Sequence, residues 1–316
     1  MSAKIITVVG ATGAQGGSVV DFLLKNYAYK VRALTRTPES DAAKSLAARG
    51  AEIVKADAND ETSLVAAFQG SHAIFAVTDF FEPFGRLGAE KAIEIEVQQG
   101  INLAKAATAT STLEHYIWST LPDAHRLSNG KYTIPHFEAK NKIDRYIKSN
   151  ASLHTKTTFL WVTFYASNYC YPMYTPHYIP TAGKYIQIQS TSADALLFSI
   201  GDVRANVGPV VEAILAQPNK TRDGTFVHAY TDKITAGDML QAWATAQNKN
   251  ALHVRVDKDV YNAMWPGWSE EMGTMMEFWE SAGENGWSGE DRIIAMEELG
   301  VKGLVDIKQA FLALKF

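Results

Sequence analysis

Three glycines spaced three residues apart could bind phosphate groups. The stretch VVGATGAQGG (residues 8–17) places Gly10, Gly13 and Gly16 directly after an apolar run. Gly10 permits a tight turn out of a strand, Gly13 lets the backbone approach a pyrophosphate, and Gly16 lets the next helix pack closely. That helix offers free N–H groups and the positive end of its dipole to the phosphates. Although the spacing differs from Gly-x-Gly-x-x-Gly, we interpret this loop as a dinucleotide site.

An arginine at the end of the second expected strand could select the cofactor. NAD-binding proteins usually carry an acidic residue about 20 residues after the glycine loop, which binds the ribose 2′-hydroxyl. Here the stretch VRALTR (31–36) ends in Arg36 and contains no carboxylate. A guanidinium pairs well with a phosphate and poorly with a bare hydroxyl. The sequence therefore predicts NADP(H) rather than NAD(H), unless Arg36 is only a solvated surface residue.

A parallel sheet must position these residues, and the first half of the chain has the pattern of one. Short β-branched or aromatic runs alternate with helical stretches. Right-handed crossovers then produce a doubly wound, Rossmann-type α/β fold. The expected strands are 5–9, 31–34, 52–55, 73–77, 115–118 and 158–162, and the expected helices are 17–25, 42–48, 63–68, 90–107 and 136–148.

After about residue 165 this alternation breaks down. Residues 165–185 are rich in Tyr, Pro and Asn and are expected to form a loop. We expect an NADP-binding Rossmann domain at 1–155 and a smaller, mixed substrate or partner domain at 156–316, with segments that return to the Rossmann sheet. The later elements expected are a helix at 206–216, a strand at 225–229 and a helix that begins near residue 235.

The composition excludes several classes of protein. A chain with 47% hydrophobic and 20% charged residues has an ordinary globular composition, and a net charge of −4 argues against direct nucleic-acid binding. The lone Cys170 suits a reducing compartment. We find no leader pattern and no apolar stretch of about 18 residues, so we expect a cytoplasmic or nuclear protein without a membrane segment. Because no Cys/His ligand spacing, HExxH, Walker loop or Gly-x-Ser-x-Gly elbow occurs, no metal is expected.

Seven stretches occur in the same order over residues 4–150 as in a known family. They are VVGATGAQGG, VRALTR, VKADAND, AIFAVTDF, EVQQGINLAKAA, HYIWSTL and HFEAKNKIDRYIK, and GDVRANVGPVVEAIL follows later. In these stretches the chain resembles the NmrA-like proteins, a branch of the atypical short-chain dehydrogenase/reductase superfamily. Some members and relatives of this family are NADPH-dependent reductases, whereas others are redox sensors or regulators of transcription.

The resemblance implies further contacts with the cofactor. For Asp57 of the ADAND stretch, a turn or helix-capping role explains the residue nearly as well as a contact with the adenine does. The residues implied to contact the cofactor can be grouped by the part that each would meet. They are Thr12, Gly13, Ala14 and Gln15 along the pyrophosphate, Arg36 at the 2′-phosphate, Asp57 and Ala58 at the adenine, and Val77 and Thr78 near the nicotinamide-side ribose.

The resemblance also implies where a catalytic set would lie. Short-chain dehydrogenases use Ser or Thr, Tyr and Lys, with the Tyr one helical turn before the Lys. Lys140 stands at the lysine position, His136 replaces the tyrosine, and Ser119 and Thr120 follow the fifth expected strand. Lys140 is expected to contact the cofactor ribose. His136 can act as a general acid near neutral pH, but after Pro135 it can equally be an ordinary first-turn residue.

Two later stretches could line the reacting centre. In the family the loop TFYASNY (163–169) passes near the nicotinamide, so Tyr165 and Asn168 are candidates there. The Met- and Trp-rich stretch 264–279 is interpreted as a packed helix, as the wall or lid of an apolar pocket, or as a self-association patch. Residues 280–291, rich in Gly, Ser and acidic residues, are expected to form an exposed loop.

These observations lead to one hypothesis and two alternatives. The hypothesis is an NADP(H)-dependent reductase of a small, largely apolar carbonyl, imine or activated alkene, for which secondary metabolism is one setting. The first alternative is a non-catalytic NADPH-sensing regulator that binds a transcription factor or a metabolic enzyme. The second is a dinucleotide-stabilised protein with non-redox chemistry. The sequence leaves the oligomeric state open.

Overall fold

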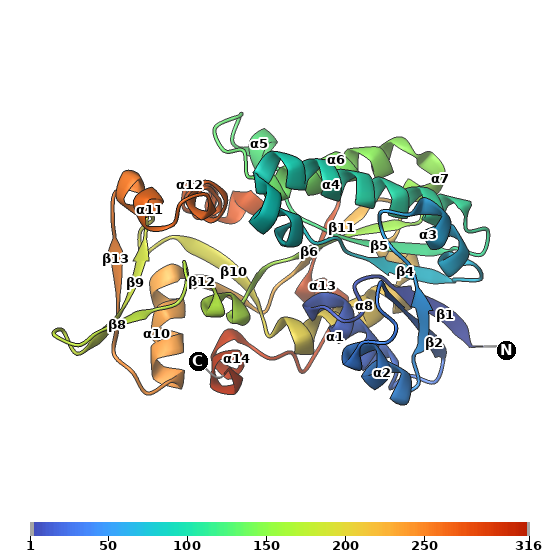
Figure 1. Cartoon of the computed structure of the whole chain (residues 1–316), viewed down its shortest axis with the longest axis horizontal. Coiled ribbons are helices and arrows are strands. Elements are labelled where there is room, and N and C mark those ends of the chain that lie inside the picture. Colours follow the sequence, from blue (N-terminus) through green and yellow to red (C-terminus); the bar gives the residue numbers. More distant parts are fainter. Residues whose placement is uncertain (1–2, 315–316) are drawn as a thin grey trace.

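The structure is a computed structural model that describes residues 3–314. Within that range the centre of the molecule is an eight-stranded sheet in which all neighbouring strands are parallel (Figure 1). The expected doubly wound fold is therefore confirmed. In their order across the sheet, the strands are β14 (Ile293–Ala295), β11 (Thr225–Ala229), β6 (Thr157–Val162), β5 (His115–Thr120), β4 (Ala73–Ala76), β1 (Lys4–Val8), β2 (Tyr29–Thr35) and β3 (Glu52–Lys55).

Helices cover both faces of this sheet through two apolar cores (Figure 1). One face carries α1 (Ala14–Leu23), α2 (Asp41–Ala48) and α8 (Val203–Ala216), and the other carries α3 (Glu61–Phe68), α4 (Phe81–Ala109) and α6 (Pro135–Ser149). Each buried Val, Leu or Ile in these cores contributes about 1.5–3 kcal/mol. Four short helices complete the layers: α5 (Ala124–Leu127), α7 (Ala151–His154), α9 (Pro218–Thr221) and α13 (Met296–Leu299).

The strand order reverses between β1 and β4, and this reversal places the site. The chain leaves β1 toward β2 and β3, and it later returns to β4 on the other side of β1. The loops at the carboxyl ends of β1 and β4 therefore diverge and leave a crevice, where doubly wound sheets bind their ligands.

A smaller mixed region packs beside the sheet (Figure 1). Strands β6, β11 and β14 of the second half return to the main sheet, whereas the exact boundary at residue 155 stays a prediction. The region has two small sheets, β12 (Asp232–Thr235), β10 (Leu196–Gly201) and β7 (Phe164–Tyr165), and β13 (Ala251–Arg255), β9 (Lys184–Gln189) and β8 (His177–Ile179). Its helices are α10 (Ala236–Ala246), α11 (Lys258–Met264), α12 (Thr274–Ala282) and α14 (Ile307–Ala313), with the 3-10 turns η1 (Ala166–Cys170) and η3 (Gly283–Trp287) and the π turn η2 (Ser269–Gly273).

Two expectations about loops are wrong in part. Residues 165–185 contain η1 and β8, because the aromatic stretch pairs as an antiparallel hairpin with β9. Residues 280–291 are not one exposed loop, since Trp287 is buried and its ring stacks on Trp279 at 4.7 Å. Burial of the large Trp287 ring holds this segment against the protein, although most of its other residues are small or polar.

A glycine divides the helix that follows β4. Gly88 has φ 79° and ψ 176°, which interrupts α4 between a short first segment (81–87) and its long remainder. This break explains why the sequence pattern predicts a helix only from residue 90. The short segment lies beside the carboxyl end of β4. None of the helices between residues 3 and 314 is both long and apolar enough to cross a membrane.

Candidate active site

A cavity of about 910 Å³ opens at the carboxyl ends of the central strands, and every site residue predicted from the sequence lines it. The fold thus brings together residues as far apart in the chain as Gly10 and Asn168. Their individual roles stay predictions. They are Gly10, Thr12, Gly13, Ala14, Gln15, Gly16, Arg36, Asp57, Ala58, Val77, Thr78, Ser119, Thr120, His136, Lys140, Tyr165 and Asn168.

The glycine loop turns tightly between β1 and α1. Gly10 has φ +67°, a conformation that side chains other than glycine rarely adopt, and the Gly13 N–H donates to the Gly10 carbonyl at 2.9 Å. A Cβ at Gly16 would lie 2.3 Å from the Gly10 carbonyl oxygen. The first turn of α1 can therefore approach the loop only without a side chain at Gly16, and its N–H groups face the cavity.

A short chain of hydrogen bonds connects this loop with the fifth strand. Ser119 donates to Gln15 Oε1 at 2.7 Å, and Gln15 Nε2 donates to the Tyr165 hydroxyl at 2.6 Å. Burial raises the pKa of Tyr165 to about 12, although the Gln15 contact lowers it. Tyr165 therefore keeps its hydroxyl hydrogen at neutral pH, and Gln15 holds both side chains at the cavity wall.

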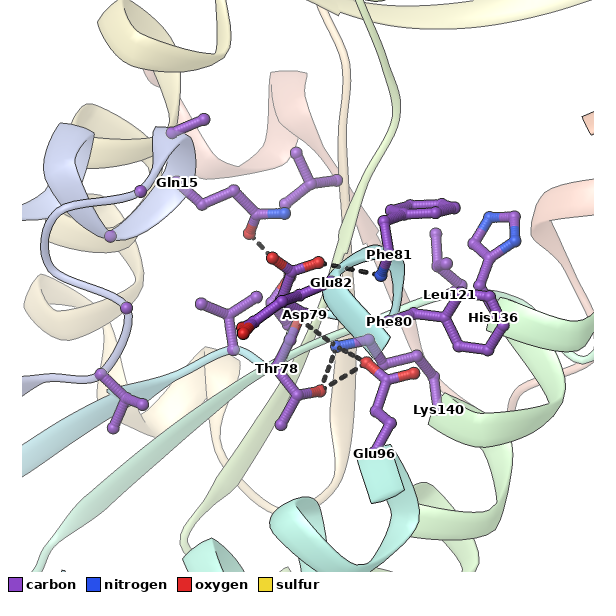
Figure 2. A pocket seen from close by; sticks show the side chains of 18 of the residues that line it. Gln15, Thr78, Asp79, Phe80, Phe81, Glu82, Glu96, Leu121, His136 and Lys140 are labelled. Carbon is purple, nitrogen blue, oxygen red and sulfur yellow. Dashed lines mark hydrogen bonds and ion pairs between the residues drawn. The ribbon is translucent and has the colours of Figure 1, made fainter. Parts of the chain in front are cut away.

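Lys140 lies in a buried ionic cluster, which Figure 2 shows together with Thr78 and Glu96. Its Nζ is 2.6 Å from Thr78 Oγ1 and 3.1 Å from Glu96 Oε1, and it lies over the Trp118 ring at 4.8 Å. Thr78 in turn donates to Glu96 at 2.7 Å. Since Glu96 has no solvent exposure, it needs the lysine charge beside it. This cluster holds the ammonium at the cavity wall beside Thr78, just past the carboxyl end of β4.

Sequence reasoning missed Glu96, although a signal for it exists. Glu96 shares its helical spacing with the buried residues Ala92, Gly100 and Leu103 of α4. A carboxylate on the apolar face of a helix must have a partner, because an isolated buried charge is very costly. That spacing could have identified Glu96 as a site residue.

His136 contacts a second buried glutamate. Its Nδ1 is in hydrogen-bond contact with Oε1 of Glu271, which has no solvent exposure and comes from η2. Three phenylalanine rings pack against the His136 ring, with the Phe81 ring centroid 5.3 Å from that of His136, and Trp268 stacks in turn on Phe81. Figure 2 shows the His136 ring beside Phe81 at the cavity edge. No sequence pattern signalled Glu271.

Thr120 is engaged by a buried carboxylate on α6. Its hydroxyl donates to Asp144 Oδ2 at 2.8 Å, and Trp118 Nε1 donates to the other oxygen at 2.7 Å. The hydroxyl hydrogens of Thr120 and Ser119 are therefore both used within the protein, whereas the Tyr165 hydroxyl accepts from Gln15 and keeps its own hydrogen. Burial raises the pKa of Asp144 to about 7, while the bonds from Thr120 and Trp118 and the charge of Lys148 lower it.

This raised pKa predicts a pH-dependent stability. Folding favours protonated Asp144, so its contribution is complete below about pH 4 and is lost as the pH rises toward 7, with Lys148 and Glu290 as its charged neighbours. As the pH rises from 4 to 8, the free energy of unfolding of Asp144→Asn should therefore increase relative to that of the parent by up to about 4 kcal/mol. Urea unfolding at both values measures it, with the exposed Asp259→Asn as control. An equal difference at both pH values would contradict the prediction.

Arg36 is paired with a glutamate that the sequence analysis did not select. Its guanidinium contacts Glu82, with Nη2 2.9 Å from Oε2. The hydrogen bond from Arg36 holds the pKa of Glu82 below its usual value, so the carboxylate is ionised at neutral pH. Both side chains are more than 40% exposed, so a 2′-phosphate can compete with Glu82 for the guanidinium.

This competition gives a pair of opposite expected effects. Arg36→Glu should weaken NADPH binding at least about tenfold, because the 2′-phosphate loses a charge-assisted partner. Glu82→Gln should strengthen it by a few fold, as the worth of an exposed pair is about 0–1 kcal/mol. Fluorescence titration with NADPH and NADH measures both, with Arg49→Glu outside the cavity as control. Unchanged NADPH affinity in Arg36→Glu would refute the assignment of the phosphate site.

Asp57 and Ala58, which the resemblance places at the adenine, have hydrogen-bond partners within the protein. Asp57 Oδ1 accepts the Asn59 N–H at 2.9 Å, which is the turn role foreseen as one of its two interpretations. The Ala58 carbonyl accepts from Asn102. The contacts of Asp57 and Ala58 with an adenine ring stay predictions. The contacts of Val77 and Asn168 with the nicotinamide side of the cofactor stay predictions as well.

Aromatic and methionine side chains form the far wall of the cavity. Within the tail, Trp268, Met272, Met275 and Trp279 line it, which supports the pocket-wall interpretation of this stretch. Self-association through this stretch is still a prediction. The Phe81 ring stacks on the Trp268 ring, with 6.2 Å between the two ring centroids, and this contact connects the short first segment of α4 with the tail. In the part of the chain that is described, no group of His, Cys, Asp and Glu is arranged to hold a metal.

Comparisons with known proteins agree with this architecture. The model of the NmrA-like family matches residues 2–303. The NmrA-like family domain-containing oxidoreductase hkm9 of Aspergillus hancockii is 31% identical over 261 residues, 78% of this chain and 74% of that protein. The oxidoreductase notA of Aspergillus sp. (strain MF297-2) is 41% identical over 48% of this chain, a match that spans less than half (44%) of that relative. The solved structure of NmrA, a negative transcriptional regulator, in complex with NAD has a TM-score of 0.78 at 21% identity, covering 99% of this chain and 96% of that one.

Proposed function

Because the chain belongs to the NmrA-like family, we propose that it is an NADP(H)-dependent reductase of a small, largely apolar carbonyl, imine or activated alkene. One observation carries the proposal. One cavity is lined by the glycine loop, by an aromatic wall and by Lys140 and His136. The name of the relative hkm9 as an oxidoreductase supports the same class of reaction.

The residues present fit a bound dinucleotide. The lack of a Cβ at Gly16 lets the first turn of α1 pack against the Gly10 carbonyl, which brings the N-terminal end of α1 to the cavity. Arg36 supplies a cation for a 2′-phosphate, and Lys140 supplies one for the ribose hydroxyls at the other end. When bound, the cofactor supplies a hydride, and the protein must bind, orient and protonate the acceptor.

The wall opposite the cradle suits an apolar acceptor. Trp268, Met272 and Trp279 offer flat and pliable apolar surfaces. Ser119 and Tyr165, joined through Gln15, can hold a polar atom of the substrate at the edge of this surface. The Lys140 ammonium favours negative charge that develops on that atom during hydride transfer.

The test follows NADPH oxidation with a panel of quinones, enones, imines and aromatic aldehydes. Lys140→Ala is run beside the parent, with Lys142→Ala, whose side chain is on the surface, as the matched control. Turnover that only the Lys140 variant loses supports the reductase and starts to identify the substrate. Tight NADPH binding without turnover of any acceptor overturns it and supports a sensor that binds a protein partner.

A further inference from the structure

We propose that His136 and Glu271 form a proton relay, in which His136 Nε2 protonates the substrate while Glu271 passes its proton to Nδ1. The inference rests on the proposed reductase function and adds the source of its proton. His136, which stands where short-chain dehydrogenases usually carry the tyrosine, thereby has a partner on the distant element η2.

The geometry of the pair comes from an unusual turn. Glu271 lies in η2, and π-helical turns are rare and frequently occur at functional sites. Its Oε1 contacts His136 Nδ1 and also accepts the His136 backbone N–H at 3.3 Å. Nε2 is therefore the ring nitrogen left for the substrate cavity, which His136 lines.

The pair stands between two cavities. A second cavity of about 320 Å³ is lined by Glu271, Glu270, Pro135 and Trp268, among others, but not by His136. The first cavity is lined by His136 and Trp268 but not by Glu271. Over residues 3–314 no hydrogen-bond partner exists for Glu271 Oε2, and a buried carboxylate oxygen of this kind calls for water. The second cavity is the place from which water can reach it.

Burial decides where the proton of the pair resides. Desolvation lowers the pKa of His136 to about 3, and the charge of Lys140, itself paired with Glu96, acts in the same direction. An anionic Glu271 without solvent exposure is also disfavoured. The neutral pair then has its proton on Glu271, shared with Nδ1, and a second hydrogen on Nε2.

The transfer balances with hydride reduction. As the acceptor gains a hydride, the Nε2–H bond breaks and its proton joins the O, N or C atom that carries the developing charge. The Glu271 proton moves to Nδ1, which leaves a neutral imidazole and a carboxylate. After the product leaves, the Nδ1 proton returns to the Glu271 carboxylate. Water in the substrate cavity, which His136 lines, delivers a proton to Nε2 and leaves hydroxide to the solvent, which restores the starting pair. The net reaction consumes one hydride from NADPH and one proton from water.

A purely structural role for Glu271 gives different expectations. As a cap for the first turn of α6 it needs only an acceptor for the His136 N–H, which glutamine also provides. Glu271→Gln therefore keeps the cap and removes the relay. Glu277→Gln is the matched control, because Glu277 lies on the next helix, α12, and pairs with Lys258 on the surface.

The first arm of the test measures the histidine tautomer by ¹⁵N NMR of the full chain, with and without NADPH. We expect hydrogen on Nε2 of His136 at pH 7, and hydrogen on Nδ1 alone overturns the relay whether or not an acceptor is found. This arm does not depend on turnover. Failure of NADPH binding in the parent would instead count against the proposed function.

The second arm uses the acceptor that the panel identifies. Glu271→Gln should lower kcat about 10²-fold, with KM and NADPH affinity within about twofold, because general acid catalysis contributes on this scale. Glu277→Gln should match the parent, and thermal unfolding checks that both variants fold. An unchanged kcat in a folded Glu271→Gln, or an equal loss in both variants, overturns the relay.

Discussion

Lys140→Met is expected to abolish turnover and to lower the free energy of unfolding by about 3–5 kcal/mol. The lysine neutralises Glu96, which has no solvent exposure, at 3.1 Å. Without it the carboxylate is a buried charge whose nearest partner is the Thr78 hydroxyl. The loss of turnover has a separate cause, since the ammonium proposed to contact the cofactor ribose and the reacting atoms disappears from the cavity wall.

A double variant separates these two effects. Lys140→Met combined with Glu96→Gln leaves no unpaired charge and keeps an acceptor for Thr78, so most of the lost stability should return. Turnover should not return, because the catalytic cation is still absent. Urea unfolding and NADPH oxidation measured on the parent, the single and the double variant distinguish the two roles. Recovery of turnover in the double variant would show that Lys140 acts only as a counter-ion.

Gly16→Ala is expected to reduce NADPH affinity by a factor of about 10–100 and to destabilise the fold by about 1–3 kcal/mol. Its Cβ would lie 2.3 Å from the Gly10 carbonyl oxygen and 2.9 Å from that of Val9. Both contacts are with backbone, which cannot rotate away as a flexible side chain does. The first turn of α1 must therefore move from the loop, and its N–H groups move with it.

A second helical glycine provides the control. Gly85 also lies in a helix, α4, but a Cβ there would meet nothing within 4 Å. Gly85→Ala should leave NADPH affinity unchanged and match or slightly exceed the parent in stability, because alanine favours helix by up to about 1 kcal/mol. Calorimetric titration with NADPH and thermal unfolding test both variants. Equal NADPH affinity in Gly16→Ala and the parent would remove the cradle from the proposed cofactor site.

The early elements were predictable because their signals are local. Strands β1 to β6 are short apolar runs, and the helices between them repeat their apolar residues with helical spacing. Gly10 needs a positive φ at a turn, a requirement visible without knowledge of the fold. The order of strands then follows from right-handed crossovers. Residues at the carboxyl ends of these strands consequently meet in one cavity.

Partners from distant segments were beyond local signals. Arg36 contacts Glu82, 46 residues away, and His136 contacts Glu271, 135 residues away. Sequence periodicity shows which face of a helix is buried, but not which side chain it meets across the cavity. In isolation, the histidine at position 136 therefore fits a catalytic and an ordinary role equally well.

By itself the sequence determined the Rossmann framework and the tight glycine turn after β1, and it predicted the cofactor role of Arg36, because each depends on backbone preferences and on residues near one another in the chain. Only the tertiary structure decided the ionic partners and the apolar wall. The buried acidic side chains of Glu96 and Glu271 are tolerated because packing places a lysine against the first and a histidine ring nitrogen against the second. Such pairings are set by how α4, α6 and η2 pack, and their energies arise from the removal of water, which no single segment achieves alone.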